Sequence, residues 1–146
     1  MAERSVSKSP SDWLLAAEAA FRLLVAHLAL GIVPFSRLAA SLSRHREGGE
    51  RTMDENEIRR IGWAVEAAAS RLPMSLTCLR QAFAASWMLQ ARGHRPRLYY
   101  GVGKDEKGGF RAHAWVEADG HPVVGQRTAG QFRLLSVFPA SSLEAG

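Results

Sequence analysis

The sequence predicts a single α+β domain, in which N-terminal helices and a central helix carrying the only cysteine pack against a small antiparallel sheet. Two patterns predict this class. As far as Gly93 the apolar residues recur at helical spacing, whereas from Arg97 onwards short runs alternate in polarity and end at turn residues. The composition agrees, because 47% of the 146 residues are apolar, which is enough for one packed core.

The first half of the chain predicts three helices before the cysteine. The first opens at Ser11 or Asp12, either of which suits an N-cap, and Pro34 marks its end. Leu72-Pro73 ends the third, since the residue before a proline avoids the helical conformation. The predicted helices span about 12–33, 35–43 and 54–71, and a charged, Gly-containing loop at 44–51 precedes the third.

The predicted domain organisation is simple. Residues 1–10 are Ser-rich and are expected to be disordered. Residues 11–146 form one domain, in which residues 11–52 are a helical extension and residues 53–146 the core.

The first predicted helix raises the question of a membrane span. Residues 14–33 are largely apolar and reach about the 20 residues that a spanning helix needs. Glu18, Arg22 and His27 interrupt the run, each costly in hydrocarbon, and no small-residue cleavage site of a signal peptide follows. We therefore expect an amphipathic helix packed on its own domain, no membrane span and a cytoplasmic location. A docking surface for a partner protein or a membrane is the alternative.

The second half predicts the sheet and the helix that supports it. The central helix opens in residues 75–78, ends at Gly93 and is apolar over much of its circumference, so we expect it to be buried. Asp119-Gly120 is a strong signal for a two-residue hairpin. The predicted strands span about 97–102, 110–117, 122–125 and 132–138.

Composition excludes several classes of protein. A single cysteine rules out a disulfide framework and a Cys-based structural zinc site. The net charge is +5, but the sequence lacks the dense Lys/Arg stripe of a nucleic-acid binder, so no nucleic-acid partner is expected. Cys78, His113 and His121 include no close ligand pair, and we expect neither a metal nor another cofactor.

The single cysteine occupies a position suited to a reactive thiol. Cys78 is expected in the first turn of the central helix, where unpaired backbone N–H groups and the positive dipole end stabilise a thiolate. Six basic residues and no acidic one lie between Glu66 and Asp105, which predicts a positive local field. A lone cysteine near an apolar helix is more often a buried small hydrophobe, and position alone leaves that interpretation open.

A candidate base lies inside a predicted strand. His113 differs in this from the other four histidines, which fall on a helix, in a loop or at turns. Strand alternation places His113, Trp115 and Glu117 on one face of that strand. A histidine paired with the thiol of Cys78 is the nucleophile–base pair of a cysteine hydrolase.

Hairpin pairing predicts a third group. The pairs that follow from a turn at Asp119-Gly120 are Ala118 with His121, Trp115 with Val124 and His113 with Gln126. Gln126 would accept a hydrogen bond from one ring nitrogen of His113 and leave the other facing a thiol. A one-residue bulge would bring Gly125 or Arg127 opposite His113 instead. Glu117 is the second choice for this orienting role.

Three segments together carry a resemblance to a known family. They are residues 71–79 (RLPMSLTCL), residues 93–100, and His113-Ala114-Trp115-Val116-Glu117 with Asp119-Gly120. They resemble the lasso-peptide biosynthesis B2 proteins, which belong to the transglutaminase-like, papain-related cysteine protease superfamily. The resemblance covers nearly the whole chain, because residues 14–35 look like the family's N-terminal helix.

The resemblance implies roles for individual residues. Cys78 would be the nucleophile and His113 the base, and residues 53–146 the catalytic core of a transglutaminase-like, papain-like fold. The family commonly has an Asp on the strand after the histidine, where this chain reads Val124-Gly125-Gln126-Arg127. The third catalytic position therefore departs from the family pattern.

The resemblance also implies an activity and partners. The protein would be a cysteine peptidase that removes the leader from a ribosomal precursor peptide, after which a separate ATP-dependent cyclase joins the freed amine to an Asp or Glu side chain. The chain has no room for a leader-recognition domain, so a separate leader-binding protein is implied. Its docking surface would be the first helix, around Trp13, Leu14, Phe21 and Leu24, or the face near Arg95 and Arg97.

Two other functions compete with this one. A transglutaminase-type acyl transferase would form the same thioester and pass the acyl group to an amine instead of water. A non-catalytic scaffold would dock the precursor peptide and the cyclase through the first helix and the Arg-rich face.

Overall fold

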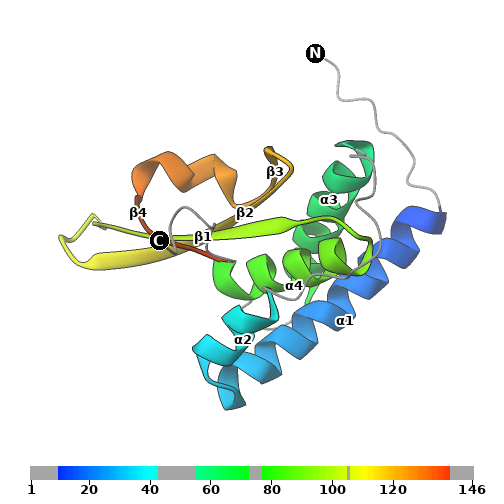
Figure 1. Ribbon diagram of the computed structural model, residues 1–146, viewed down its shortest axis with the longest axis horizontal. Helices are drawn as coiled ribbons and strands as arrows, with labels where there is room; N and C mark the ends of the chain where they lie inside the picture. The colour runs from blue at the N-terminus through cyan, green and yellow to red at the C-terminus, as the bar shows by residue number, and fades with distance from the viewer. Residues whose placement is uncertain (1–9, 43–54, 73–76, 105, 139–146) are drawn as a thin grey trace.

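The computed structural model describes residues 10–42, 55–72, 77–104 and 106–138. Helices come first, then a sheet, as the sequence predicts (Figure 1). The helices are α1 (Pro10–Ile32), α2 (Phe35–Ser41), α3 (Glu55–Arg71) and α4 (Cys78–Ala91). The sheet consists of β1 (Pro96–Lys104), β2 (Phe110–Ala118), β3 (His121–Val124) and β4 (Arg133–Phe138), with a 3₁₀-helix η1 (Gln126–Gln131) between the last two strands. The α+β class is confirmed.

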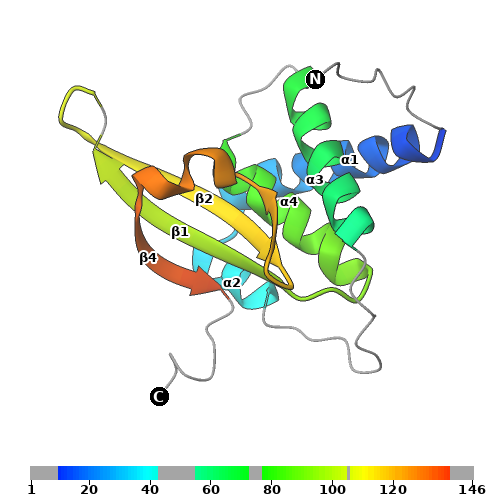
Figure 2. The same cartoon turned by 90° about the horizontal axis from the view of Figure 1, so that it is seen from above.

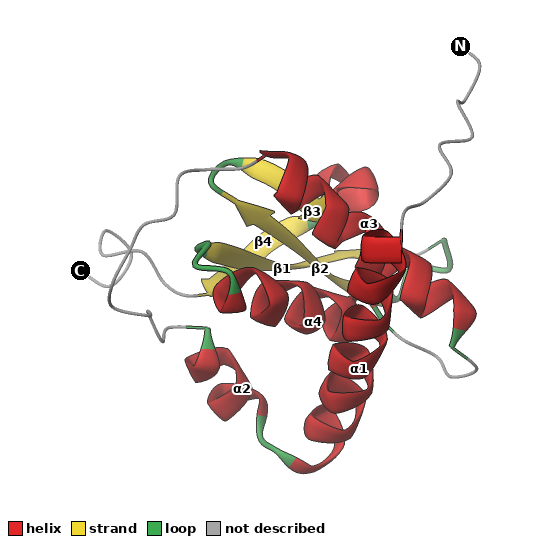
Figure 3. Ribbon diagram, turned by 90° about the vertical axis from the view of Figure 1, so that its right-hand side faces the viewer, coloured by secondary structure: helices red, strands yellow, loops and turns green. Residues whose placement is uncertain are grey.

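The sheet has the order β3-β2-β1-β4, with antiparallel neighbours throughout. Helix α4 lies along one of its faces, and α1 packs on α4 away from the sheet (Figure 3). Seen from above, η1 lies over the opposite face of the sheet, beside β2 (Figure 2). The helical half and the sheet therefore share the layers of one α+β domain.

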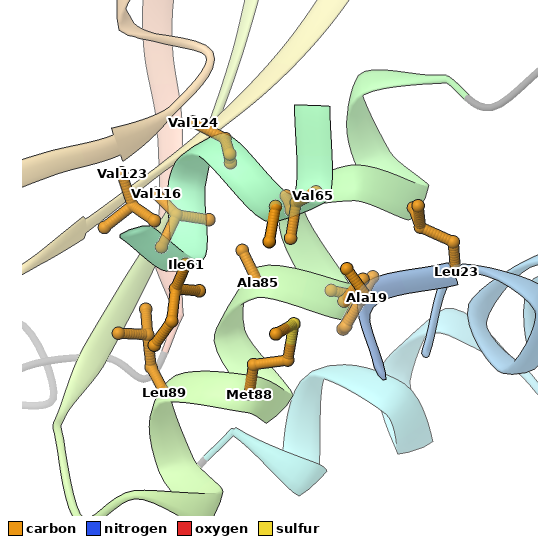
Figure 4. Packing of buried hydrophobic residues seen from close by; sticks show 14 of the residues in the cluster. Ala19, Leu23, Ile61, Val65, Ala85, Met88, Leu89, Val116, Val123 and Val124 are labelled. Atoms are coloured by element: carbon orange, nitrogen blue, oxygen red, sulfur yellow. The ribbon is translucent and has the colours of Figure 1, made fainter. Parts of the chain in front are cut away.

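The core is built around α4. Its side chains Phe83, Met88 and Leu89 are fully buried, which confirms the central buried helix expected from its apolar circumference. Every neighbouring layer contributes apolar groups to the same cluster (Figure 4). They include Ala19 and Leu23 of α1, Ile61 and Val65 of α3, Val116 of β2, and Val123 and Val124 of β3.

The β2–β3 hairpin forms at the predicted turn, but its register slips by one residue. Asp119 and Gly120 both have positive φ, 52° and 80°, as a type I′ turn requires. Ala118 pairs with His121 as predicted, whereas Val124 pairs with Val116 and not with Trp115. The slip is a bulge next to Pro122, which has no N–H to give to the ladder. The predicted pairing of His113 with Gln126 is therefore wrong.

Helix α1 directs its charged groups toward the domain. Glu18 accepts hydrogen bonds from Arg92 of α4 at 2.5 and 3.0 Å, and Asp12 accepts one from Arg60 of α3 at 2.9 Å. Because Asp12 and Glu18 point toward α3 and α4, the outward face of α1 is left mainly apolar. Its most exposed members are Leu14 at 72%, Phe21 at 64%, Leu28 at 63% and Ile32 at 81%.

By length and composition alone, α1 could cross a membrane. The same test is passed by core helices of soluble proteins and by signal sequences, and 22% of its most apolar window is buried inside the structure. The predicted packing of α1 on its own domain is confirmed by its contacts with α3 and α4.

The remaining element predictions differ from the structure mainly at their ends. Helix α1 begins at Pro10, which the sequence placed in the disordered segment, and β1 continues to Lys104, beyond the predicted strand end. The 3₁₀-helix η1 was not predicted. Residues 1–9 and the predicted loop 44–51 lie outside the described residues.

Candidate active site

Cys78 is the first residue of α4, and its side chain is partly exposed. Thr77 precedes it at the N-cap position, yet the Thr77 hydroxyl makes no capping hydrogen bond and instead accepts one from Arg80 at 3.0 Å. The helical ladder starts with the bond from the Gln81 N–H to the Thr77 carbonyl, so the first-turn amides have no partner within the helix. These amides and the helix dipole favour negative charge beside the Cys78 thiol.

His113 lies near the middle of β2, where the strand loses its neighbour. The ladder from β3 reaches back only to Val116, so β2 has an uncovered edge at His113. The ring stacks against Phe132, with centroids 4.9 Å apart, and against Trp115 at 5.8 Å. Trp115 shares the predicted strand face with His113, and Phe132 reaches it because Gly101, opposite His113, leaves room for its side chain. Aromatic packing thus limits the rotation of the imidazole.

A backbone carbonyl fixes the tautomer of His113. The ring atom Nε2 lies 2.7 Å from the carbonyl oxygen of Gly125. Because a carbonyl oxygen only accepts, Nε2 must carry the hydrogen, and a neutral ring then has its lone pair on Nδ1. His113 is therefore held in the tautomer that acts as a base through Nδ1.

This bond replaces the one predicted for Gln126. The ladder of β3 ends at Val124 after its register shift, and the backbone carbonyl of Gly125, not the side chain of Gln126, lies at the ring nitrogen. The side-chain amide of Gln126 donates instead to the carbonyl of Val116, which ties the start of η1 to β2. Glu117, the second-choice orienter, lies beside Tyr99, where its carboxylate adds to the effect of burial in raising the pKa of the Tyr99 hydroxyl.

A pocket of about 380 Å³ brings these groups together at the uncovered edge of β2. Its lining residues come from α3, α4, β2, β3 and the start of η1. They are Glu66, Cys78, Gln81, His113, Ala114, Val124, Gly125 and Gln126. All three predicted site residues, Cys78, His113 and Gln126, therefore line a single pocket.

Two of the lining residues were missed by sequence reasoning. Gln81 lies three residues after Cys78 on α4, so helical spacing alone could have placed its amide on the same side of the helix. Glu66 belongs to α3, and only the packing of α3 on β3 brings it to the pocket.

The approach of α3 to β3 depends on Gly62. A Cβ at this position would collide with the backbone carbonyl of Val123. Glu66 follows Gly62 by one helical turn on the same face, and it lines the pocket together with Val124 and Gly125. The sequence predicts a positive field around Cys78 because no acidic residue lies between Glu66 and Asp105. The structure adds the carboxylate of Glu66 itself to the lining of the Cys78 pocket.

His121 lies apart from Cys78 and His113. His121 is at the hairpin turn, with Nδ1 4.0 Å from Glu55, and is not in the pocket lining. No group of three or more His, Cys, Asp and Glu side chains with metal-binding geometry occurs among the residues that the structure describes.

Comparison with known proteins gives one match. The family model described as the transglutaminase-like superfamily matches residues 20–137. No curated protein and no solved structure matches the chain. The matched range includes α3, α4 and the sheet up to the penultimate residue of β4, and with them every described residue that lines the pocket.

Proposed function

Because the chain belongs to the transglutaminase-like superfamily, we propose that it is a cysteine peptidase that removes the leader from a ribosomal lasso-peptide precursor. The superfamily includes both cysteine peptidases and acyl transferases. The observation that carries the proposal is the common pocket, whose lining includes both Cys78 and His113, together with the fixed tautomer of the His113 ring. The resemblance of residues 71–79 and 113–120 to the B2 proteins supports the narrower assignment.

The first half of the reaction forms a thioester. Nδ1 of His113 accepts the proton of the Cys78 thiol, and the thiolate attacks the carbonyl carbon of the scissile peptide bond. The first-turn amides of α4 donate hydrogen bonds to the oxyanion, since the Thr77 side chain at the N-cap does not occupy them. Gln81 is a further candidate donor on the same wall. When the tetrahedral intermediate collapses, His113 gives its proton to the leaving amine, which departs as the new N-terminus of the core peptide.

The second half releases the leader. His113 takes a proton from water, the hydroxide attacks the thioester carbon, and the C–S bond breaks. The products are the leader with a free carboxylate and the Cys78 thiol, which regains its proton from His113. An amine in place of water would complete the acyl-transferase reaction instead.

Partners follow from the size of the substrate. A flexible leader loses about 1–2 kcal/mol of conformational entropy per fixed residue, and the described helices and strands are all engaged in the domain's own layers. A separate leader-binding protein would supply the missing recognition and raise the local concentration of the scissile bond. The cleaved core would then pass to an ATP-dependent cyclase, and all three proteins would act in the cytoplasm, where the precursor is made.

Of the two docking surfaces, the outward face of α1 has more support. Its side chains Leu14, Phe21 and Leu28 are more than half exposed with no charged group among them, which suits an apolar protein face. Arg97, on the other surface, lies opposite the acidic Glu117 in the β1–β2 register, so that surface is not uniformly basic.

Mass spectrometry of the products tests the proposal. The precursor is incubated with the wild-type protein and the leader-binding protein, and with the Cys78→Ala variant as the matched control. We expect a free leader with a carboxylate terminus, and no product from Cys78→Ala. An amine adduct would establish the acyl transferase, and an intact precursor would establish the scaffold.

A further inference from the structure

We infer that Glu66 makes one wall of the catalytic pocket a subsite for a positively charged group of the peptide substrate, a Lys or Arg side chain close to the scissile bond. This inference rests on the proposed peptidase activity for the identity of the substrate. The existence of the cation-binding wall itself does not depend on that activity.

The position of Glu66 supports the subsite. Its side chain lines the same pocket of about 380 Å³ as Cys78 and His113. The other described lining residues, apart from this pair, are uncharged: Gln81, Ala114, Val124, Gly125 and Gln126. Among the described residues, a substrate group that enters the pocket on the α3 side therefore meets one acidic side chain and no Lys or Arg side chain.

The ionic pairing of the domain leaves this carboxylate available. The chain contains 19 Lys and Arg residues, and several acidic groups of the helices pair with them, as Glu18 does with Arg92 and Glu55 with Arg59. Glu66, which is solvent-exposed, has no ion-pair partner among the described residues. In the described part of the chain no Lys or Arg side chain pairs with the Glu66 carboxylate, so a cationic group of the substrate can form that ion pair.

The scaffold fixes where this charge lies. Gly62 lets α3 approach the backbone of Val123 more closely than any side chain at position 62 would allow. The next helical turn then places Glu66 in the lining of the same pocket as Val124 and Gly125, and the Gly125 carbonyl holds His113. The carboxylate and the carbonyl that positions His113 are thus both held by the close contact of α3 with β3.

The first experiment measures the field at Cys78 without using catalysis. Methanethiosulfonate reagents with a trimethylammonium, a neutral methyl or a sulfonate tail modify the only thiol: the thiolate attacks the sulfur, a disulfide forms and methanesulfinate leaves. For a reagent charge about 8 Å from one protein charge, at an effective dielectric of about 40, the Coulomb energy changes the rate constant for modification about fivefold. We expect the ratio of cationic to anionic rate constants to fall about tenfold or more in Glu66→Gln at low salt, and by less at 0.5 M salt.

Glu106→Gln is the matched control, because Glu106 is exposed in the β1–β2 loop and does not line the pocket. It removes the same charge and should leave the ratio unchanged. A ratio that is equal in wild type and Glu66→Gln, or that falls equally in the control, would overturn the subsite.

The second experiment measures specificity. Precursor peptides carry Lys, norleucine or Glu at each position within three residues of the scissile bond. We expect wild type to prefer Lys over norleucine at least fivefold in kcat/KM at one of these positions, and Glu66→Gln to lose that preference while it still cleaves the norleucine peptide. Cleavage with no Lys preference at any position would overturn the substrate assignment. If no peptide is cleaved, the proposed peptidase activity fails, and the reagent ratio still decides whether the cation-binding wall exists.

Discussion

Gly125 is the residue at which a single methyl group tests the geometry of the site most directly. Its φ is +83°, and a Cβ there would lie 2.7 Å from the Ala114 carbonyl oxygen and 2.9 Å from Cβ of Trp115. In Gly125→Ala the left-handed backbone costs about 1–2 kcal/mol, and the contact with β2 costs about 1–3 kcal/mol more because backbone must move. We expect a loss of about 3 kcal/mol in the free energy of unfolding, which is a fall of about 10 °C in Tm for a chain of this length.

Gly120→Ala is the matched control. Gly120 has nearly the same φ, +80°, but nothing lies within 4 Å of its Cβ position. It should lose only the backbone contribution, about 1 kcal/mol or about 3 °C. Circular dichroism melts of both variants separate the cost of the close approach from the cost of the conformation. Equal Tm values for the two variants would refute the tight packing of Gly125 on β2.

The same substitution moves the carbonyl that holds His113. Displacement of a positioning group by about 1 Å can cost up to about 100-fold in rate, so we expect the kcat for leader cleavage to fall about 10- to 100-fold in Gly125→Ala at 15 °C, where the variant is folded. Gly120→Ala should keep the wild-type kcat. Nitrogen NMR of wild-type His113 provides an independent check, because the neutral form of the ring should carry its hydrogen on Nε2. A folded Gly125→Ala protein with wild-type kcat would show that this carbonyl does not position the base.

Three further predictions concern the charge network, η1 and the partner surface. Glu18→Gln should lower the free energy of unfolding by about 1–2 kcal/mol at pH 7; the hydrogen bond from Arg92 lowers the pKa of Glu18 below 4.5, so in urea titrations the difference from wild type should persist above that pH and vanish as pH falls through the lowered pKa. Gln126→Ala should lower the free energy of unfolding by about 1 kcal/mol, because the Val116 carbonyl loses its hydrogen-bond donor. Gln126→Asp should lower it more, because a carboxylate cannot donate. The kcat should fall less in Gln126→Ala than in His113→Ala, and equal losses in kcat would make Gln126 part of the catalytic unit. Phe21→Ser with Leu28→Ser should leave cleavage by the isolated protein unchanged but reduce its stimulation by the leader-binding protein at least fivefold in single-turnover assays, whereas unchanged stimulation would move the docking surface to Arg95 and Arg97.

Local patterns in the sequence were sufficient for the elements and for two of the site residues. Helix lengths, the end of α1 before Pro34, the buried character of α4 and the Asp119-Gly120 turn all depend on short-range sterics and on hydrophobic periodicity. Cys78 was placed at the start of α4, and His113 inside a strand, by the same local rules. Such predictions succeed because the physical cause lies within a few residues of its effect.

The third group of the site depended on an event that local pairing rules do not fix. Counting back from the turn gave Gln126 opposite His113, but the ladder shifts beside Pro122 and ends at Val124, and the Gly125 carbonyl accepts the hydrogen bond from His113 instead. The sequence shows that Pro122 has no N–H to donate. Whether the strand pairing then shifts by a bulge or stops altogether depends on how the strand packs. Here Val123 packs against Gly62 of α3, 61 positions earlier in the chain, and that contact holds the bulged conformation in place.

What the sequence by itself determined is therefore the α+β order of elements, the family resemblance and the two residues, Cys78 and His113, that stand out by type and local setting. Only the tertiary structure decided that the two line one pocket, that the carbonyl of Gly125 sets the tautomer of His113, and that Glu66 stands on the pocket wall. The physical reason is the same in each case. A residue's propensity and face follow from its near neighbours in the chain, whereas hydrogen-bond partners and local charge follow from contacts between α3, α4 and the sheet, which form only when the core packs.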